Sequence, residues 1–150
     1  MLCGRYVVQD EHVRTVFEVD DDEADAMVAA AIAAARGIGI RVSVAVVDRG
    51  GRLKRFARMD GAEVAGTTLA QHKAFSALAN SCSTEELASD ARPGGSLYGI
   101  ASSGAGEFTI VGGGAVVTRD GDVLAGIGVS GGTAGQDREC AEAAVAVLSD

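Results

Sequence analysis

Residues 41–48 constrain the fold most strongly, because small or apolar side chains fall on both faces of this stretch. In an extended chain, successive side chains point to opposite sides. One side then carries three valines and the other carries small or apolar residues (Val42, Val44 and Val46; Ser43, Ala45 and Val47). A strand that is apolar on both faces is typically buried on both. We therefore expect this strand to lie inside a sheet that is covered on each side.

Turn signals beside short apolar stretches predict hairpins. Asp48-Arg-Gly-Gly51 is typical of a turn, after which residues 52–59 would return antiparallel. Arg119-Asp-Gly-Asp122 predicts a second hairpin. The further predicted strands are Tyr6–Val8, Val13–Val19, Phe108–Val111, Ala115–Thr118 and Val123–Val129. Because hairpins join most strands and helices lie at the edges of the order, the pattern favours an α+β fold with an antiparallel sheet flanked by helices.

Helix starts are marked by three capping boxes, each a capping side chain followed three residues later by Glu or Gln. The pairs are Asp20 with Glu23, Ser83 with Glu86, and Thr133 with Gln136. They predict a helix that closes at Gly37 and Gly39, a short helix to about Ser89, and a last helix over 133–149. Apolar spacing predicts another helix over 63–80. Residues 91–106 hold the only proline and five glycines, so they are predicted to form a loop.

Length and charge narrow the classes of function. The 150 residues fit a single domain over 1–150, and a net charge of −8 argues against nonspecific binding to nucleic acid or an anionic membrane. Apolar runs fall far short of the ~20 residues of a membrane helix, and the start lacks the apolar stretch of a secretory signal. Three cysteines without CxxC spacing fit reduced thiols better than a zinc site or a disulfide framework. We expect a cytoplasmic protein.

A series of short motifs resembles one known family. In chain order they are Val44-Ala-Val-Val-Asp48, Gly51-Arg-Leu53, Arg58-Met-Asp-Gly61, Ala70-Gln-His-Lys-Ala74, Gly112-Gly-Gly114 and Ile127-Gly-Val-Ser-Gly131 with Gln136-Asp137. Their order and spacing are similar to the GlcG/HbpS family of heme-binding proteins, which includes the C-terminal domain of PduO-type cobalamin adenosyltransferases. The similarity spans residues 22–149 and leaves 1–20 as an N-terminal extension.

The resemblance implies an α/β, profilin-like domain with an antiparallel five-stranded sheet and helices on both faces. It also implies self-association into a dimer or a higher homo-oligomer. Heme is the cofactor that it implies first, and a corrinoid is the alternative. Heme ligation varies between members, so the axial ligand does not follow from the resemblance.

His72 and Lys73 lead the candidates for ligand chemistry, and both lie in the Ala-Gln-His-Lys-Ala motif. A neutral imidazole can ligate heme iron, so His72 is the predicted metal ligand; the alternative is a surface or interface histidine. Lys73 could pair with a propionate, phosphate or carboxylate, or form a structural ion pair with Asp48 or Asp60. The other histidine, His12, lies in a polar segment and ranks behind His72.

The predicted cofactor-binding set also contains Arg58, Asp60, Gly113 and Ser130. Arg58 ends a basic strip that either receives an anion or only blocks pairing at a sheet edge. The strip comprises Arg49, Arg52, Lys54, Arg55 and Arg58. Gly113 and Ser130 lie in the glycine-rich turns Gly112–Gly114 and Gly128–Gly132, the second just before the helix start at Thr133. Such turns either allow close packing or line a pocket with backbone N–H groups.

Three functions stay open at this point. The first is binding of heme or a related tetrapyrrole between the sheet and the helix over 63–80, at a subunit interface. The second is an enzyme acting on a small anionic metabolite, with Lys73, Arg58 and the glycine-rich turns binding the substrate and Asp60 or His72 moving protons. The third is a structural subunit without a ligand, which would still form a firm oligomer.

Overall fold

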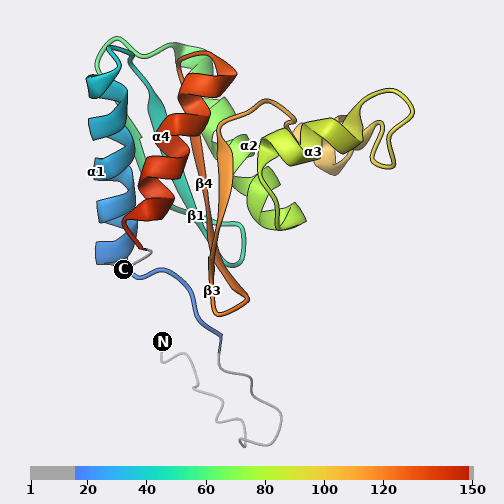
Figure 1. The fold of residues 1–150 in the computed structure, drawn as a ribbon, viewed down its shortest axis with the longest axis horizontal. Helices are drawn as coiled ribbons and strands as arrows, with labels where there is room; N and C mark the ends of the chain where they lie inside the picture. Colours follow the sequence, from blue (N-terminus) through green and yellow to red (C-terminus); the bar gives the residue numbers. More distant parts are fainter. Residues whose placement is uncertain (1–15, 149–150) are drawn as a thin grey trace, which may run out of the picture.

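A computed structural model describes residues 16–148, which form one antiparallel sheet with helices on both faces (Figure 1). The strands are β1 (Ser43–Asp48), β2 (Leu53–Arg58), β3 (Gly114–Arg119) and β4 (Asp122–Ser130), in the spatial order β2-β1-β4-β3. The helices are α1 (Asp21–Gly37), α2 (Val64–Asn80), α3 (Thr84–Ala91) and α4 (Ala134–Ala146). Two short 3₁₀ turns, η2 (Ile100–Ser102) and η3 (Gly104–Gly106), lie in the loop after α3.

The strand over residues 41–48 occupies the centre of the sheet, as its two apolar faces predict. Val44 in β1 pairs with Ala57 in β2 and with Val129 in β4, both antiparallel. The β3–β4 hairpin turns at Asp120 and Gly121, both with positive φ (54° and 85°). A two-residue turn with positive φ at both positions suits the Asp-Gly pair, because its twist matches that of the flanking strands.

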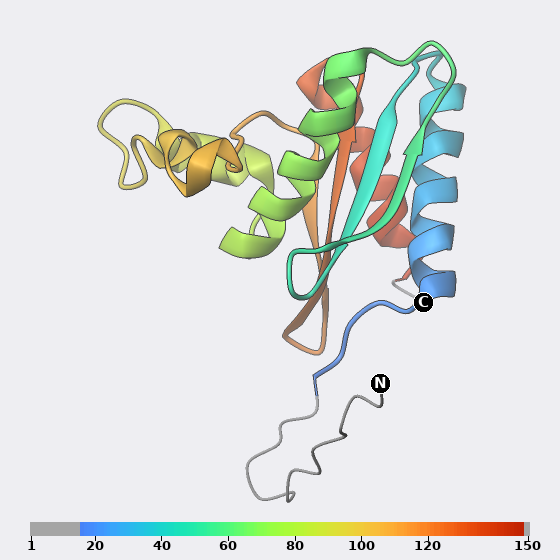
Figure 2. The same ribbon diagram turned by 180° about the vertical axis from the view of Figure 1, so that it is seen from behind.

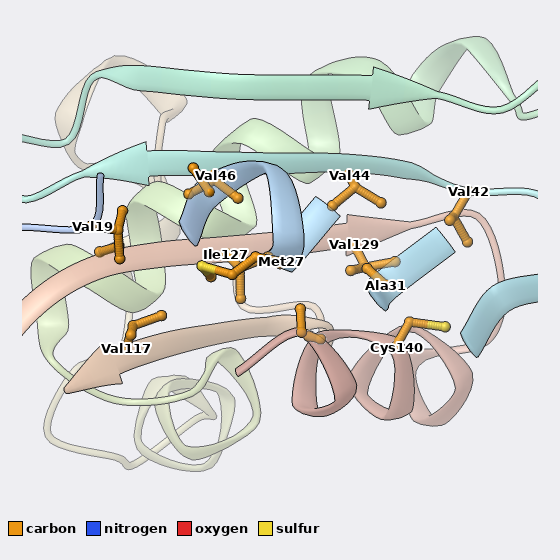
Figure 3. Close-up of a cluster of buried hydrophobic side chains, with 14 of the residues drawn as sticks. Val19, Met27, Ala31, Val42, Val44, Val46, Val117, Ile127, Val129 and Cys140 are labelled. Atoms are coloured by element: carbon orange, nitrogen blue, oxygen red, sulfur yellow. The ribbon is translucent and has the colours of Figure 1, made fainter. Parts of the chain in front are cut away.

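Helices α1 and α4 cover one face of the sheet, and the larger apolar side chains of the core gather beneath them (Figure 3). Met27 on α1, Ile127 on β4 and Cys140 on α4 are fully buried in this cluster. The three valines on one side of residues 41–48 point to this face (Val42, Val44 and Val46). Burial of such side chains supplies the main stabilisation of the fold.

Helix α2 covers the opposite face, seen in front in Figure 2, and it packs on small residues. A Cβ added at Gly128 would collide with the backbone carbonyl of Ala70 and lie 2.6 Å from the amide nitrogen of Ala74. A Cβ at Gly126 would collide with the carbonyl of Ala74. The backbone of α2 therefore lies directly on a glycine stripe of β4.

All three capping boxes are present, at Asp20, Ser83 and Thr133. The corresponding helices begin where the sequence predicts, and α4 ends at Ala146, three residues before the predicted end. Helix α2 matches the predicted 63–80 almost residue for residue, although the side chain of its N-cap residue Glu63 makes no capping hydrogen bond. No helix in the described part of the chain is both long and apolar enough to cross a membrane.

The expectation of five strands is corrected: the sheet formed by the described residues has four. Phe108–Val111 is not a strand, because the backbone N–H of Thr109 donates to Ser76 Oγ (2.8 Å) on α2 instead of to a neighbouring strand. The predicted strand Tyr6–Val8 lies outside the described residues. So does the first half of Val13–Val19, and residues 16–19 are not in a strand.

Helix α3 and the following loop project from the body as an arm, which stands apart from the sheet in both ribbon views (Figures 1 and 2). Within residues 92–107 most side chains are exposed. The backbone hydrogen bonds of this stretch are local, as in Leu97 N–H to Asp90 O (3.1 Å) and Glu107 N–H to Gly104 O (3.1 Å). The predicted loop is thus confirmed, and it rejoins the body where Phe108 reaches α2.

Candidate functional site

Two adjoining hollows lie between α2 and the β1–β2 hairpin, and they share Gly51 and Phe75. The first has a volume of about 170 Å³ and holds the partly exposed side chain of His72. Its other lining residues are Val47, Gly51, Leu53, Gln71, Phe75 and Glu107. The second, of about 430 Å³, runs towards the end of α2 and is lined by Arg49, Leu78 and Val123 among others. Together the two hollows form a groove that is lined by both apolar and polar side chains (Val47, Leu53, Phe75, Leu78 and Val123; Arg49, Gln71, His72 and Glu107).

Local geometry explains why this groove exists. Gly51 has φ +76°, and a Cβ there would lie 3.1 Å from the ring of Phe75. The hairpin can pass close to the aromatic ring only because this position carries no side chain. Leu53 at the start of β2 is 49% exposed, so part of the apolar lining of the groove faces solvent.

The base of the arm is anchored beside His72. The rings of Phe75 and Phe108 lie with their centroids 5.5 Å apart at 43°, a favourable tilted contact. Ser76 Oγ donates to the carbonyl of His72 (2.6 Å) and accepts from the N–H of Thr109 (2.8 Å). These contacts bring Glu107 to the edge of the hollow that holds His72.

Lys73 points away from the groove and is the largest fully buried side chain among the described residues, at 1% exposure. Its ammonium donates to Asp137 Oδ2 (2.8 Å) and to the carbonyl of Val129 (2.8 Å). Asp137 Oδ1 in turn accepts from the N–H of Gly132 (2.8 Å). The ion pair that the sequence left open for Lys73 therefore exists, but its partner is Asp137 rather than Asp48 or Asp60.

Gly113 and Ser130 lie near this buried pair rather than in the groove. Gly113 has φ +111°, and a Cβ there would lie 2.6 Å from Asp137 Cβ and 3.0 Å from Lys73 Nζ. Ser130 is buried at the end of β4, where it pairs with Ser43 of β1. Within the described residues, Ser43 Oγ and Glu85 Oε2 are buried without a hydrogen-bond partner.

Arg58 and Asp60 lie at the other end of the β1–β2 hairpin. The guanidinium of Arg58 donates to the carbonyl of Ala62 (Nη2, 2.7 Å), and in the sheet Arg58 pairs with Ser43. Asp60 is exposed, and its carbonyl accepts from Arg41 (3.4 Å). Of the six predicted cofactor-binding residues, Lys73 and Gly113 lie side by side. Arg58 and Ser130 lie on two different strands, and each pairs with Ser43 of the strand between them. His72 lines the groove without the other five.

The basic strip lies largely on the edge strand β2, and several of its charges have acidic partners. Lys54 approaches Asp21 (3.4 Å), Arg55 bonds Asp25 (2.6 Å), and Arg49 lies 3.7 Å from Asp122. Hydrogen bonds from Lys54 and then Arg55 hold the pKa of Asp21 below its usual range. This arrangement agrees with the sheet-edge interpretation of the strip.

Neither of the two cysteines in the described part of the chain, Cys82 and Cys140, belongs to a metal-binding cluster. No group of three or more His, Cys, Asp or Glu that could hold a metal ion occurs among the residues that the structure describes. Cys82 and Cys140 are free, and burial, followed by the charges of Asp137 and Glu139, raises the pKa of Cys140 to about 11. A single axial ligand such as His72 does not require such a group.

Sequence reasoning missed Phe75, Leu53 and Glu107 as groove residues. Phe75 could have been found, because it follows His72 by three residues and so shares its helix face. Glu107 could not, because only the docking of Phe108 on α2 brings it there.

Known proteins share both the sequence and the fold. Corrinoid adenosyltransferase PduO from Citrobacter freundii is 37% identical over 120 residues, which is 80% of this chain and 36% of that protein. The chain therefore spans about a third of that relative. The solved complex of PduOC with heme superimposes with a TM-score of 0.83 at 33% identity, covering 86% of this chain and 94% of that one.

A second structure and a family match agree with these relatives. A double mutant of HbpS from Streptomyces reticuli superimposes with a TM-score of 0.87 at 30% identity, covering 98% of each chain. Residues 19–146 match the family described as "Haem degrading protein HbpS-like". On this match, which covers most of its length, the chain belongs to the HbpS-like family.

Proposed function

We propose that this protein binds heme in the groove between α2 and the β1–β2 hairpin, with His72 as a ligand of the iron. The observation that carries the proposal is the partly exposed imidazole of His72, which lines a hollow together with the apolar side chains of Leu53 and Phe75. Support comes from the related PduOC, which has been solved with heme at 33% identity. Neutral imidazole is a common axial ligand of heme iron.

The residues of the groove fit a heme in chemical kind. Phe75 offers an aromatic ring and Leu53 and Leu78 offer apolar surface for the macrocycle, while Arg49 offers a cation for a propionate. The contacts of Arg49 with Asp122 (3.7 Å) and with the carbonyl of Phe17 (3.5 Å) are long, so this guanidinium is available to an anionic group.

Heme, when bound, supplies an iron whose reactivity depends on its axial ligand and on solvent access. In the proposed complex His72 would bind the iron. The N–H of Thr109 donates to Ser76 Oγ, which donates to the carbonyl of His72, and these hydrogen bonds hold this part of α2 in place. The hollow beside His72, about 170 Å³, is smaller than the hollows that enclose drug-sized ligands. A bound heme would therefore keep an exposed side, and we propose that a second copy of the chain covers it.

A hemin titration tests the ligand assignment. We expect saturable binding with a shifted Soret band, and a loss of at least about tenfold in affinity for His72→Ala, which corresponds to roughly 1.4 kcal/mol. The matched control is His12→Ala, which removes the other histidine of the chain. Unaltered binding by His72→Ala, or a loss confined to His12→Ala, would contradict the assignment.

A corrinoid is the second candidate ligand, because two relatives are corrinoid adenosyltransferases. The same titration with hydroxocobalamin, alone and in competition with hemin, separates the two ligands. We expect hemin to bind more tightly, because the related PduOC has been solved with heme and the ring of Phe75 in the groove suits a flat macrocycle. Native mass spectrometry of the purified protein then reports any retained cofactor and tests the proposed homo-oligomer.

A further inference from the structure

The face of α2 that packs on the sheet consists mostly of small residues. Its buried residues are Gly66, Ala70, Lys73, Ala74, Ser76, Ala77 and Leu78, and the strand beneath presents Gly126 and Gly128. Helices usually find their position when side chains of one element fit between those of the other. Apart from Lys73 and Leu78 these residues are small, so they let the helix come close but offer few side-chain ridges to resist sliding or rotation.

Lys73 is the one charged side chain among the buried residues of α2, and it ends in directed hydrogen bonds. Its ammonium is held by Asp137 Oδ2 on α4 and by the carbonyl of Val129 on β4, each at 2.8 Å. Asp137 is itself held by the N–H of Gly132 before α4. Because α2 and α4 lie on opposite faces of the sheet, this pair joins the two helical layers.

The glycine-rich turn Gly112–Gly114 packs closely against the Lys73–Asp137 pair. A Cβ on Gly113 would lie 3.0 Å from Lys73 Nζ and 2.6 Å from Asp137 Cβ. The carbonyl of Gly113 accepts from the N–H of Val129 (2.8 Å), the residue whose own carbonyl receives Lys73. The ammonium is therefore enclosed on several sides, and 1% exposure leaves no access for a ligand.

We propose that the Lys73–Asp137 pair positions α2 so that the imidazole of His72, the next residue along the helix, enters the groove. This inference rests on the proposed function of the groove. A buried ion pair adds little stability compared with apolar side chains of similar volume, so stability alone does not explain its presence. Each residue of a helix advances 1.5 Å and turns about 100°, so a small slip of α2 would move His72 away from the hollow.

The decisive variant replaces both charges, Lys73→Met with Asp137→Leu. An apolar pair of similar length keeps the interior filled, so we expect a cooperatively unfolding protein. We expect hemin affinity to fall at least about tenfold and the imidazole NMR signals of His72 to shift or broaden in the ligand-free protein. The signals of His12 serve as the internal reference, and His72→Ala assigns the two sets.

A matched control removes an exposed ion pair on α4, the helix that carries Asp137. The control variant is Arg138→Met with Glu142→Leu, a pair whose charged atoms are 3.6 Å apart. We expect this control to leave the His72 signals and hemin affinity unchanged. The positioning role is overturned if the buried double variant keeps both the His72 signals and the hemin affinity of the unaltered protein.

A second variant keeps the test decisive if the apolar pair does not fold. Asp137→Glu retains the ion pair but lengthens it by one methylene. A shifted His72 signal supports positioning, whereas a lower unfolding midpoint with unmoved His72 signals overturns it. If the unaltered protein binds no hemin, the heme proposal fails by itself, and the ligand-free imidazole signals still decide the role of the pair.

Discussion

The two faces of the sheet are packed with residues of different size. Under α1 and α4 lie large apolar side chains such as Met27, Ile127 and Val129, all fully buried. Between α2 and the sheet most residues are glycine, alanine and other small residues, and Lys73 and Leu78 are the large side chains that α2 buries there. The first face stabilises the domain through the area that it buries. The second face brings a helix close to the strands, leaves hollows beside its end, and holds the candidate site.

The largest expected effect comes from Lys73→Met alone, which leaves the carboxylate of Asp137 buried without its cation. We expect a loss of about 3–5 kcal/mol in the free energy of unfolding. The measurement is urea denaturation followed by circular dichroism. The double variant with Asp137→Leu should recover most of this loss. A single variant as stable as the double one would show that the α2 face does not depend on charge pairing.

The α1/α4 face is probed by Met27→Ala, which removes a fully buried side chain. We expect a loss of about 2–4 kcal/mol, because a cavity remains where the side chain was. Hemin affinity should not change, because Met27 lies on the face opposite α2. Val64→Ala, at a position that is 77% exposed, is the control and should change stability by less than about 0.5 kcal/mol. Loss of hemin binding in Met27→Ala would contradict a division of roles between the faces.

Gly128→Ala tests the close contact between the backbone of α2 and the glycines of β4. Its new methyl group would collide with the backbone of Ala70, so α2 must move outward. We expect a loss of about 1–3 kcal/mol together with weaker hemin binding. The control is Gly135→Ala on α4, where a Cβ meets nothing within 4 Å. That change should stabilise the protein by about 0.5–1 kcal/mol and leave hemin binding unaltered.

The last prediction is a pH dependence of stability that arises from Cys140 on the α1/α4 face. Burial raises the pKa of this thiol from 9.0 to about 11, so the unfolded chain loses the proton first as pH rises. The contribution to stability is therefore complete below about pH 9 and is lost as pH rises through about 11. Urea denaturation at several pH values checks this. The difference in stability between the unaltered protein and Cys140→Ala should shrink over that interval, and a constant difference would contradict it.

Much of the fold follows from residues that are neighbours in the chain. The three capping boxes, the Asp120–Gly121 turn and the doubly apolar β1 are all present as predicted. The prediction for Phe108–Val111 was wrong. The pattern there is apolar enough for a strand, but the backbone N–H of Thr109 donates to the side chain of Ser76, 33 residues away, instead of to a neighbouring strand.

The candidate site was predictable only in part. His72 and Lys73 were singled out together from one motif, yet the structure separates them: one lines the groove and the other is buried against α4. Adjacent residues of a helix point about 100° apart, so a shared motif does not imply a shared site. Which of the two faces the ligand depends on what packs around the helix.

The sequence by itself determined the four helices, the two hairpins and the burial of β1, because caps, turns and alternation depend on residues a few positions apart. Only the tertiary structure decided that Lys73 pairs with Asp137, 64 residues away, and that Glu107 reaches the hollow of His72. Many acids in the chain could satisfy a lysine, and local patterns do not choose among them. The choice is made when two helical layers close on one sheet and a single carboxylate lies within hydrogen-bonding distance of the ammonium.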